Sequence, residues 1–176
     1  DLPSSVRPIT ENQRPAYLAT TLHCVTFPPG FFSRQDESSD TEFYALDRLV
    51  THIDNEAVAA VGALYDELGL NDDVLDICSS WISHFRQRPR KLVVTGMNAA
   101  ELAANTMADH AVVHDLNIDP HLPFESAAFD AVTCCVSVDY LTRPLDVFAE
   151  AARVLRPGGV FVCTFSNRCF PTKAIR

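Results

Sequence analysis

The sequence predicts an α/β fold in which a doubly wound, mainly parallel sheet carries helices on both faces. Short apolar runs suited to buried strands alternate with segments of helical periodicity between residues 70 and 165. Parallel neighbours need crossover connections, and helices between consecutive strands provide them. The chain of 176 residues is long enough for one such domain and an additional arm.

We expect the arm over residues 1–40 and the domain over residues 41–176. Prolines at positions 3, 8, 15, 28 and 29 interrupt any helix in the arm, and residues 33–40 are polar and acidic. The arm should therefore lack regular structure of its own. Its apolar pieces, residues 18–27 and 31–32, are expected to pack against the domain.

Two helices are predicted before the first strand. Val58, Val61, Leu64, Tyr65 and Leu68 recur at three- and four-residue spacing, which indicates a helix over residues 55–68. An aspartate at position 54 can cap its start and a glycine at position 69 can end it. A shorter helix is expected over residues 42–50.

The strand and helix pattern then continues to the end of the chain. Strands are expected at 74–78, 91–97, 111–114, 129–138 and 160–165, with helices over 99–107 and from Pro144 to the Pro157-Gly158-Gly159 turn. The carboxyl ends of parallel strands meet at one edge, where such sheets bind ligands. Functional residues are therefore expected directly after Cys78, Met97, His114 and Val138.

Composition excludes several classes of protein. The net charge of −9 argues against a nucleic-acid binder, and we interpret the basic residues 86–91 as a solvated loop. No apolar stretch is long enough to cross a bilayer, and no secretory signal is visible. The cysteines lie mostly in apolar runs, with no CxxC pair and no zinc-like Cys/His spacing. We expect no metal and no membrane partner, and a cytoplasmic or organelle-stroma location without secretion.

Three segments carry a resemblance to a known family. They are residues 76–82 (DICSSWI), 122–132 (LPFESAAFDAV) and 150–159 (EAARVLRPGG). Over about residues 70–167 the chain resembles class I S-adenosylmethionine-dependent methyltransferases of the type 11 branch. Residues 43–44 and 48–54 (RLVTHID) are similar to an uncharacterised group within it. The resemblance implies a Rossmann-like sheet of order 3-2-1-4-5, S-adenosyl-L-methionine as cofactor and a small-molecule acceptor.

The resemblance also implies site residues. Asp139 is the candidate for orienting or deprotonating the acceptor. The candidate cofactor-binding residues are Arg48, His52, Asp76, Cys78, Ser79, Ser80, Trp81, Asn98, Asp115, Leu116 and Ser137. Asp76 and the residues after it would face the methionine half, Asn98 the ribose and Asp115 the adenine amino group. Arg48 and His52 are four residues apart, so on a helix they would share a face and could bind the cofactor carboxylate.

Each of these residues also has a structural interpretation. Asp76 could cap the turn after its strand, and Asn98 could cap the next helix. Trp81 could be a loop anchor, and Asp115 could belong to a simple turn. Arg48 and His52 could pair with acids of the arm at the surface, and Asp139 could be a solvated loop residue.

Two departures from the family bear on activity. The positions aligned with its loop glycines carry Cys78, Ser80 and Ile82, and a β-branched residue tolerates neither positive φ nor close approach. Either the turn takes another path or the pocket is narrowed. Asn98 replaces the usual acid and predicts weaker ribose binding.

Two functional hypotheses follow, an active small-molecule methyltransferase and a non-catalytic binding or regulatory module. A nicotinamide-dependent oxidoreductase is rejected because no GxGxxG loop is present. Nine residues follow position 167, whereas the family adds two more strands. We expect either that the domain is incomplete at its C-terminal end, or that a partner covers the sheet edge, as in a homodimer.

Overall fold

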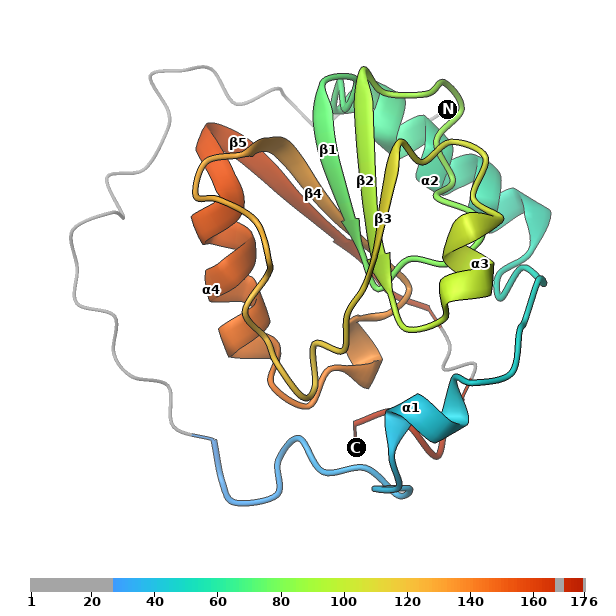
Figure 1. Cartoon of the computed structure of the whole chain (residues 1–176), viewed down its shortest axis with the longest axis vertical. Helices are drawn as coiled ribbons and strands as arrows, with labels where there is room; N and C mark the ends of the chain where they lie inside the picture. Colours follow the sequence, from blue (N-terminus) through green and yellow to red (C-terminus); the bar gives the residue numbers. More distant parts are fainter. Residues whose placement is uncertain (1–26, 167–169, 176) are drawn as a thin grey trace, which may run out of the picture.

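The structure is a computed structural model that describes residues 27–166 and 170–175. Five parallel strands form one sheet in the order β3-β2-β1-β4-β5, which confirms the predicted fold and strand order (Figure 1). The elements are α1 (Asp40–Phe43), α2 (Asn55–Glu67), β1 (Asp73–Ile77), β2 (Lys91–Gly96), α3 (Ala99–Ala103), β3 (His110–Val113), β4 (Phe129–Cys135), the 3-10 helix η3 (Val138–Tyr140), α4 (Pro144–Val154) and β5 (Leu155–Thr164).

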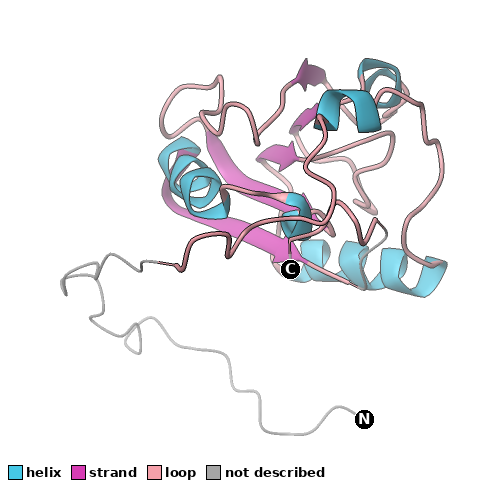
Figure 2. Cartoon of the chain, turned by 90° about the horizontal axis from the view of Figure 1, so that it is seen from below, coloured by secondary structure: helices cyan, strands magenta, loops and turns pink. Residues whose placement is uncertain are grey.

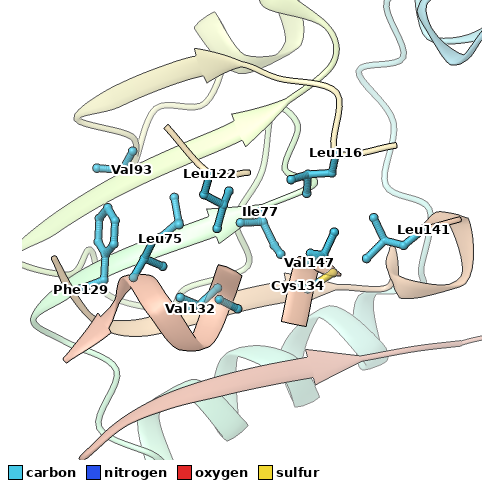
Figure 3. Close-up of a cluster of buried hydrophobic side chains, with 12 residues drawn as sticks. Leu75, Ile77, Val93, Leu116, Leu122, Phe129, Val132, Cys134, Leu141 and Val147 are labelled. Carbon is cyan, nitrogen blue, oxygen red and sulfur yellow. The ribbon is translucent and has the colours of Figure 1, made fainter. Parts of the chain in front are cut away.

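The sheet has a hydrophobic core on each face, because successive side chains of a strand point to opposite sides. Leu75 and Ile77 of β1 belong to one core, where α4 contributes Val147 (Figure 3). Val74 belongs to the other core, which includes Tyr65 of α2. Every residue of β1 is buried, as expected for the central strand of a covered parallel sheet. Figure 2 shows helices on both sides of the strands.

The helix predicted before the first strand of the sheet is confirmed as α2. The side chain of Asp54 accepts a hydrogen bond from the amide of Ala57 at 2.8 Å, and Gly69 follows the helix with φ of 67°. The helix expected over 99–107 is shorter, since α3 ends at Ala103. The side chain of Asn105 accepts from the amide of Met107 and donates to Ser83, which favours a turn over another helical residue.

The last two strands differ from their predicted bounds. β4 ends at Cys135 rather than at 138, because Val136 adopts φ of 47° and leaves the extended conformation. β5 begins at Leu155, five residues before the expected 160, because Leu155 already pairs with Phe129. Gly158 has φ of 85°, and the residues around it form an irregularity in the register between β4 and β5.

The helix predicted over residues 42–50 is wrong beyond Phe43, where α1 ends. The following segment instead bonds to loops far away in the sequence. The carbonyl of Tyr44 accepts from the side chain of Asn98, and the amide of Arg48 donates to Glu101 at 2.7 Å. Arg48 and His52 therefore do not share a helix face, because these distant partners replace the local helical hydrogen bonds.

Residues 1–26 of the predicted arm lie outside the described residues. Residues 27–39 contain no helix, and their one strand-like feature is an isolated antiparallel bridge from Arg34 to Ile175. Phe31 packs on Phe27 and Phe32 with ring centroids 4.6 and 5.1 Å apart, and it stays 48% exposed. Within the described part of the chain, no helix is long and apolar enough to span a membrane.

We use the name terminal clasp for residues 34–40 together with residues 170–175. The amide of Asp36 donates to the carbonyl of Thr172 at 2.8 Å, so segments from opposite ends of the described chain lie side by side (Figure 1). The amide of Ile175 also donates to the carbonyl of Asp139 at 2.8 Å. The clasp is thereby fixed to the carboxyl edge of the sheet.

Candidate functional site

A cleft opens at the carboxyl edge of the sheet, where the loops after β1, β2, β3 and β4 meet segment 44–53 and Phe170. All of the predicted cofactor-binding residues line it: Arg48, His52, Asp76, Cys78, Ser79, Ser80, Trp81, Asn98, Asp115, Leu116 and Ser137. Asp139 lies in η3 and does not line the cleft, although its neighbours Ser137 and Tyr140 do.

Asp76 forms the floor of the cleft at the end of β1 and is only 3% exposed. The hydroxyl of Thr133 donates to Oδ1 at 2.7 Å, and the hydroxyl of Ser79 donates to Oδ2 at 2.7 Å. Burial raises the pKa of Asp76 to about 6, against the opposing effect of these hydrogen bonds. Oδ2 thus holds the turn that follows β1, and Oδ1 joins the end of β1 to β4.

The turn after β1 begins with Cys78 in the left-handed region at φ of 53°, a position where the family resemblance aligns a glycine. Ser79 then crosses toward β2, and its amide donates to the carbonyl of Thr95 at 2.6 Å. The carbonyl of Ser79 lies so close to Gly96 that a Cβ at that position would overlap it. Residues 78–90 form no helix, and the second left-handed residue is His84 rather than Ile82.

The end of β2 is organised by Asn98 and Glu101. Oδ1 of Asn98 accepts from the amides of Ala100 and Glu101, which confirms that Asn98 caps α3. Nδ2 of Asn98 donates to the carbonyl of Tyr44 at 3.2 Å and to the carboxylate of Asp47 at 2.9 Å. Both polar atoms of the amide are therefore bonded within the protein.

Glu101 was missed as a site residue by the sequence analysis. Its carboxylate accepts from the amide of Arg48 and from the hydroxyl of Ser80, so it ties segment 44–53 to the loop after β1. An acid three residues after a capping Asn is typical of a capping box, and that spacing was the available signal. In the structure this acid points to the cleft, where it is a lining residue.

Asp115 lies after β3 and forms a local turn. Its Oδ1 accepts from the amides of Asn117 and Ile118 at 2.9 and 3.3 Å. The neighbouring side chain of Leu116 is buried at 5% exposure and contributes an apolar wall. The turn and the site hypotheses for Asp115 are thus compatible, because the turn uses one of its two oxygens.

Val136, directly after β4, lines the cleft in a left-handed backbone conformation. A β-branched side chain with φ of 47° is a conformational outlier, and such outliers cluster at functional sites. Its amide donates to the carbonyl of Thr164 at 2.9 Å, which holds the strained residue in place. Ser137 follows, and its hydroxyl donates to the carbonyl of Cys135 at 2.9 Å.

The terminal clasp contains a buried ion cluster, and one member of this cluster, Asp40, lines the cleft. Lys173 is fully buried, and its ammonium group lies 3.2 Å from Oδ1 of Asp40. Nη1 of Arg34 donates to both oxygens of Asp40 at 2.8 Å, and the amide of Asn117 donates to Oδ2. Burial opposes ionisation of Asp40, but these donors hold its pKa below the usual value. No periodicity or motif in the sequence signalled this cluster.

Comparison with known proteins finds a matching family model and similar relatives. Residues 80–163 match the family model described as "Methyltransferase domain". A ubiquinone/menaquinone biosynthesis C-methyltransferase UbiE of Bartonella quintana is 36% identical over 95 residues, which are 53% of this chain and 31% of that relative. The chain thus spans about a third of the length of this curated relative.

Two solved structures share the fold. A geranyl diphosphate methyltransferase in complex with SAM is 26% identical, with a TM-score of 0.51 over 60% of this chain and 48% of that chain. The [4+2]-cyclase SpnF is 17% identical, with a TM-score of 0.52 over 72% of this chain and 56% of that chain. The second likeness concerns the fold alone.

The sheet order, the matched segment and these relatives together define the class of protein. Residues 80–163 match a methyltransferase domain, and the sheet has the fold of class I S-adenosylmethionine-dependent methyltransferases.

Proposed function

We propose that this protein binds S-adenosyl-L-methionine in the cleft and transfers its methyl group to a small organic acceptor. The observation that carries the proposal is that the loops after β1, β2, β3 and β4 all contribute to one cleft. Ligands of open α/β sheets bind at this edge. The relatives named as methyltransferases support the reaction, and the acceptor is a separate question.

The residues fit such a cofactor at two of three points. Among the described residues, Oδ2 of Asp115 has no hydrogen-bond partner, so it can accept from an adenine amino group. The turn from Cys78 to Trp81 borders the cleft and would face the methionine half. At the ribose, Asn98 would have to exchange Asp47 for a hydroxyl oxygen, which predicts weaker binding than an acid would provide.

When bound, the cofactor supplies an electrophilic methyl group: a lone pair of the acceptor forms the new bond to carbon, and the carbon–sulfur electron pair returns to sulfur. The protein aligns the acceptor and excludes water. Val136 and Ser137 border the cleft at the end of β4, where an acceptor would meet the donor. Any proton released by the acceptor passes to a carboxylate or to water, and Asp139 remains a prediction for this role.

Calorimetric titration with S-adenosylmethionine and S-adenosylhomocysteine tests the proposal. We expect saturable binding of both, and about tenfold weaker binding to Asp115→Asn, which loses one charged hydrogen bond. Asp119→Asn is the matched control, because Asp119 is exposed and lies outside the cleft lining. Equal loss in both variants would contradict the role of Asp115.

A non-catalytic module is the second candidate function. It is favoured by the internal hydrogen bonds that engage both oxygens of Asp76 and both polar atoms of Asn98. Absence of heat and of any thermal shift with either ligand at millimolar concentration would remove the enzyme hypothesis and leave this one.

A further inference from the structure

Flat side chains from separate parts of the chain border the cleft. Tyr44 and His52 come from the segment before α2, Trp81 from the loop after β1, Tyr140 from η3 and Phe170 from the terminal clasp. Tyr44, His52 and Phe170 lie outside the segment that matches the family model. Trp81 and Tyr140 lie inside that segment, so this aromatic wall combines residues of the matched segment with residues from the parts of the chain on either side of it.

Phe170 is the centre of the aromatic wall. Its ring centroid lies 5.2 Å from His52, 5.9 Å from Tyr140 and 6.2 Å from Tyr44. The hydroxyl of Tyr140 accepts from the amide of Phe170 at 3.1 Å, which fixes the backbone that carries the ring. An aromatic ring of a ligand can pack against rings at such distances in an offset or edge-to-face arrangement.

Arg48 places a positive charge beside these rings. Its Cζ atom lies 5.5 Å from the centroid of Phe170 and 4.9 Å from that of Phe43, and Nη2 donates to the carbonyl of Phe43 at 2.8 Å. These contacts orient the planar guanidinium, which carries five N–H donors and also borders the cleft.

The acids that border the cleft already have protein partners. Glu101 accepts from Arg48 and Ser80, Asp76 from Thr133 and Ser79, and Asp40 from Arg34. Asp115 uses one oxygen in its turn and lies after β3. Neutral donors do not cancel the charges of Glu101, Asp76 and Asp115, but they occupy oxygens of these acids, and Arg48 is the one Arg or Lys side chain among the described residues that line the cleft.

We infer that the acceptor is a planar aromatic compound with an anionic group, such as an aromatic carboxylate or phenolate, whose ring packs on Phe170 and whose anion binds Arg48. The identification of this ligand as the methyl acceptor rests on the proposed function. An aromatic ring gains contacts that a saturated ring of equal size lacks, and guanidinium groups recognise carboxylates through paired hydrogen bonds.

Binding of 2-naphthoate, followed by protein NMR with saturating S-adenosylhomocysteine, tests the inference. Decahydro-2-naphthoate is the saturated control and 2-naphthalenemethanol the uncharged one. We expect naphthoate to bind at least tenfold more tightly than the saturated acid. Phe170→Leu should abolish this preference, and Arg48→Met should weaken naphthoate about tenfold without weakening the alcohol. Phe165→Leu, which changes a ring that is 75% exposed and outside the cleft lining, should alter nothing.

A measurement on the unaltered protein covers the case in which Phe170→Leu does not fold. Intermolecular NOEs from naphthoate to the methyl groups of Ile53 and Leu141, which line the cleft, are expected. Equal affinities for the aromatic and saturated acids would overturn the inference. So would competition between naphthoate and S-adenosylhomocysteine, since the rings would then belong to the adenine subsite. If naphthoate shows the expected preference while S-adenosylhomocysteine does not bind, the methyltransferase proposal fails and the aromatic ligand class stands.

Discussion

Asn98 shows how one side chain can serve structure and site together. Its oxygen caps α3, and its nitrogen holds the carbonyl of Tyr44 and the carboxylate of Asp47. The resemblance to the family would suggest that an acid at this position improves ribose binding. The hydrogen bonds indicate the opposite for this chain, because a carboxylate cannot donate to Tyr44 or Asp47.

We therefore expect Asn98→Asp to destabilise the protein. Asp caps a helix about as well as Asn, so the loss is confined to the two donated hydrogen bonds and a new repulsion with Asp47. The free energy of unfolding, measured in urea near neutral pH, should fall by about 1–3 kcal/mol. Asp54→Asn, the reciprocal change at the cap of α2, should change it by only a few tenths of a kcal/mol. Equal effects would contradict the role assigned to the Asn98 nitrogen.

Asp76 should make stability depend on pH. Its folded-state pKa of about 6 lies above the ordinary value of 3.8, so the folded protein keeps this proton longer than the unfolded chain does. The contribution of Asp76 to the free energy of unfolding is most favourable below about pH 4. It is lost as pH rises to about 6, a change of roughly 3 kcal/mol. Asp76→Asn removes the ionisation. Its unfolding free energy, relative to that of the unaltered protein, should therefore rise between pH 4 and pH 7.5, and a flat difference would disprove the effect.

At the scale of elements, the connection from β1 to β2 differs most from a simple strand–helix–strand unit. Residues 78–90 contain no helix, although a helix commonly follows the first strand in this class of fold. The loop is held by Ser79, which bonds to Thr95, and by Asn105, whose amide donates to the carbonyl of Ser80 at 3.1 Å. It therefore lies directly on β2 at Gly96.

Gly96→Ala should displace this loop. A Cβ there would overlap the carbonyl of Ser79 and also crowd Leu102, so we expect a loss of about 1–3 kcal/mol in unfolding free energy. NMR amide signals of residues 79–81 should shift. Gly69→Ala is the control, because Gly69 is left-handed in open space and its substitution costs only backbone strain of about 1 kcal/mol. Unshifted loop signals in Gly96→Ala would contradict the close packing.

Two of the segments that carry the family resemblance, residues 122–132 and 150–159, lie away from the cleft. Arg153 donates to the carbonyls of Leu122 and Phe124 and to Glu150, so it joins α4 to the approach to β4. Arg156 donates to Asp130 and Asp73. Two of the three segments that made the family recognisable, residues 122–132 and 150–159, thus stabilise the connection between β4, α4 and β5. These two segments do not line the cleft, whereas the third, residues 76–82, does.

At the scale of the whole molecule, the terminal clasp joins the two ends of the described chain and brings Phe170 to the cleft. Its ion cluster is costly to break, since removal of one partner leaves a buried charge without compensation. Lys173 has no exposed side-chain surface and also donates to the carbonyl of Ser38. The integrity of the cleft wall therefore depends on residues far apart in the sequence.

Asp40→Asn should cost about 3–5 kcal/mol, because Arg34 and Lys173 would both lose their carboxylate. Lys173→Met should also destabilise, and the double variant should lose less than the sum of the single losses by about 0.5–3 kcal/mol. Urea unfolding of all variants gives this coupling. The exposed pair Arg143 and Asp146 serves as the control, since Asp146→Asn should cost less than about 1 kcal/mol. Strict additivity at Asp40 and Lys173 would exclude a coupled buried cluster.

The basic stretch at residues 86–91 illustrates what composition can and cannot predict. Arg86 and Arg90 lie on the surface, as expected for a solvated loop, and pair with Asp66 and Asp73 at 3.6 and 2.9 Å. These aspartates lie in other segments of the chain, so residues 86–91 alone could not predict which acids they pair with. A homodimer through the sheet edge, a small-molecule acceptor and the cytosolic or stromal location stay predictions.

The strand order was implied by the family resemblance. The patterns of the sequence by themselves determined the parallel sheet, the α2 helix with its cap, and the set of strand ends that face one cleft. These features depend on local patterns, namely apolar periodicity, capping residues and crossover connections, which are written in neighbouring residues. Tertiary structure alone decided the non-helical course of segment 44–54, the helix-free loop after β1 and the terminal clasp. Their hydrogen bonds join residues far apart in the chain, such as Asn98 with Tyr44 and Lys173 with Asp40. No short-range pattern encodes such pairs, because each partner gains its stabilisation only after the sheet has brought the segments together.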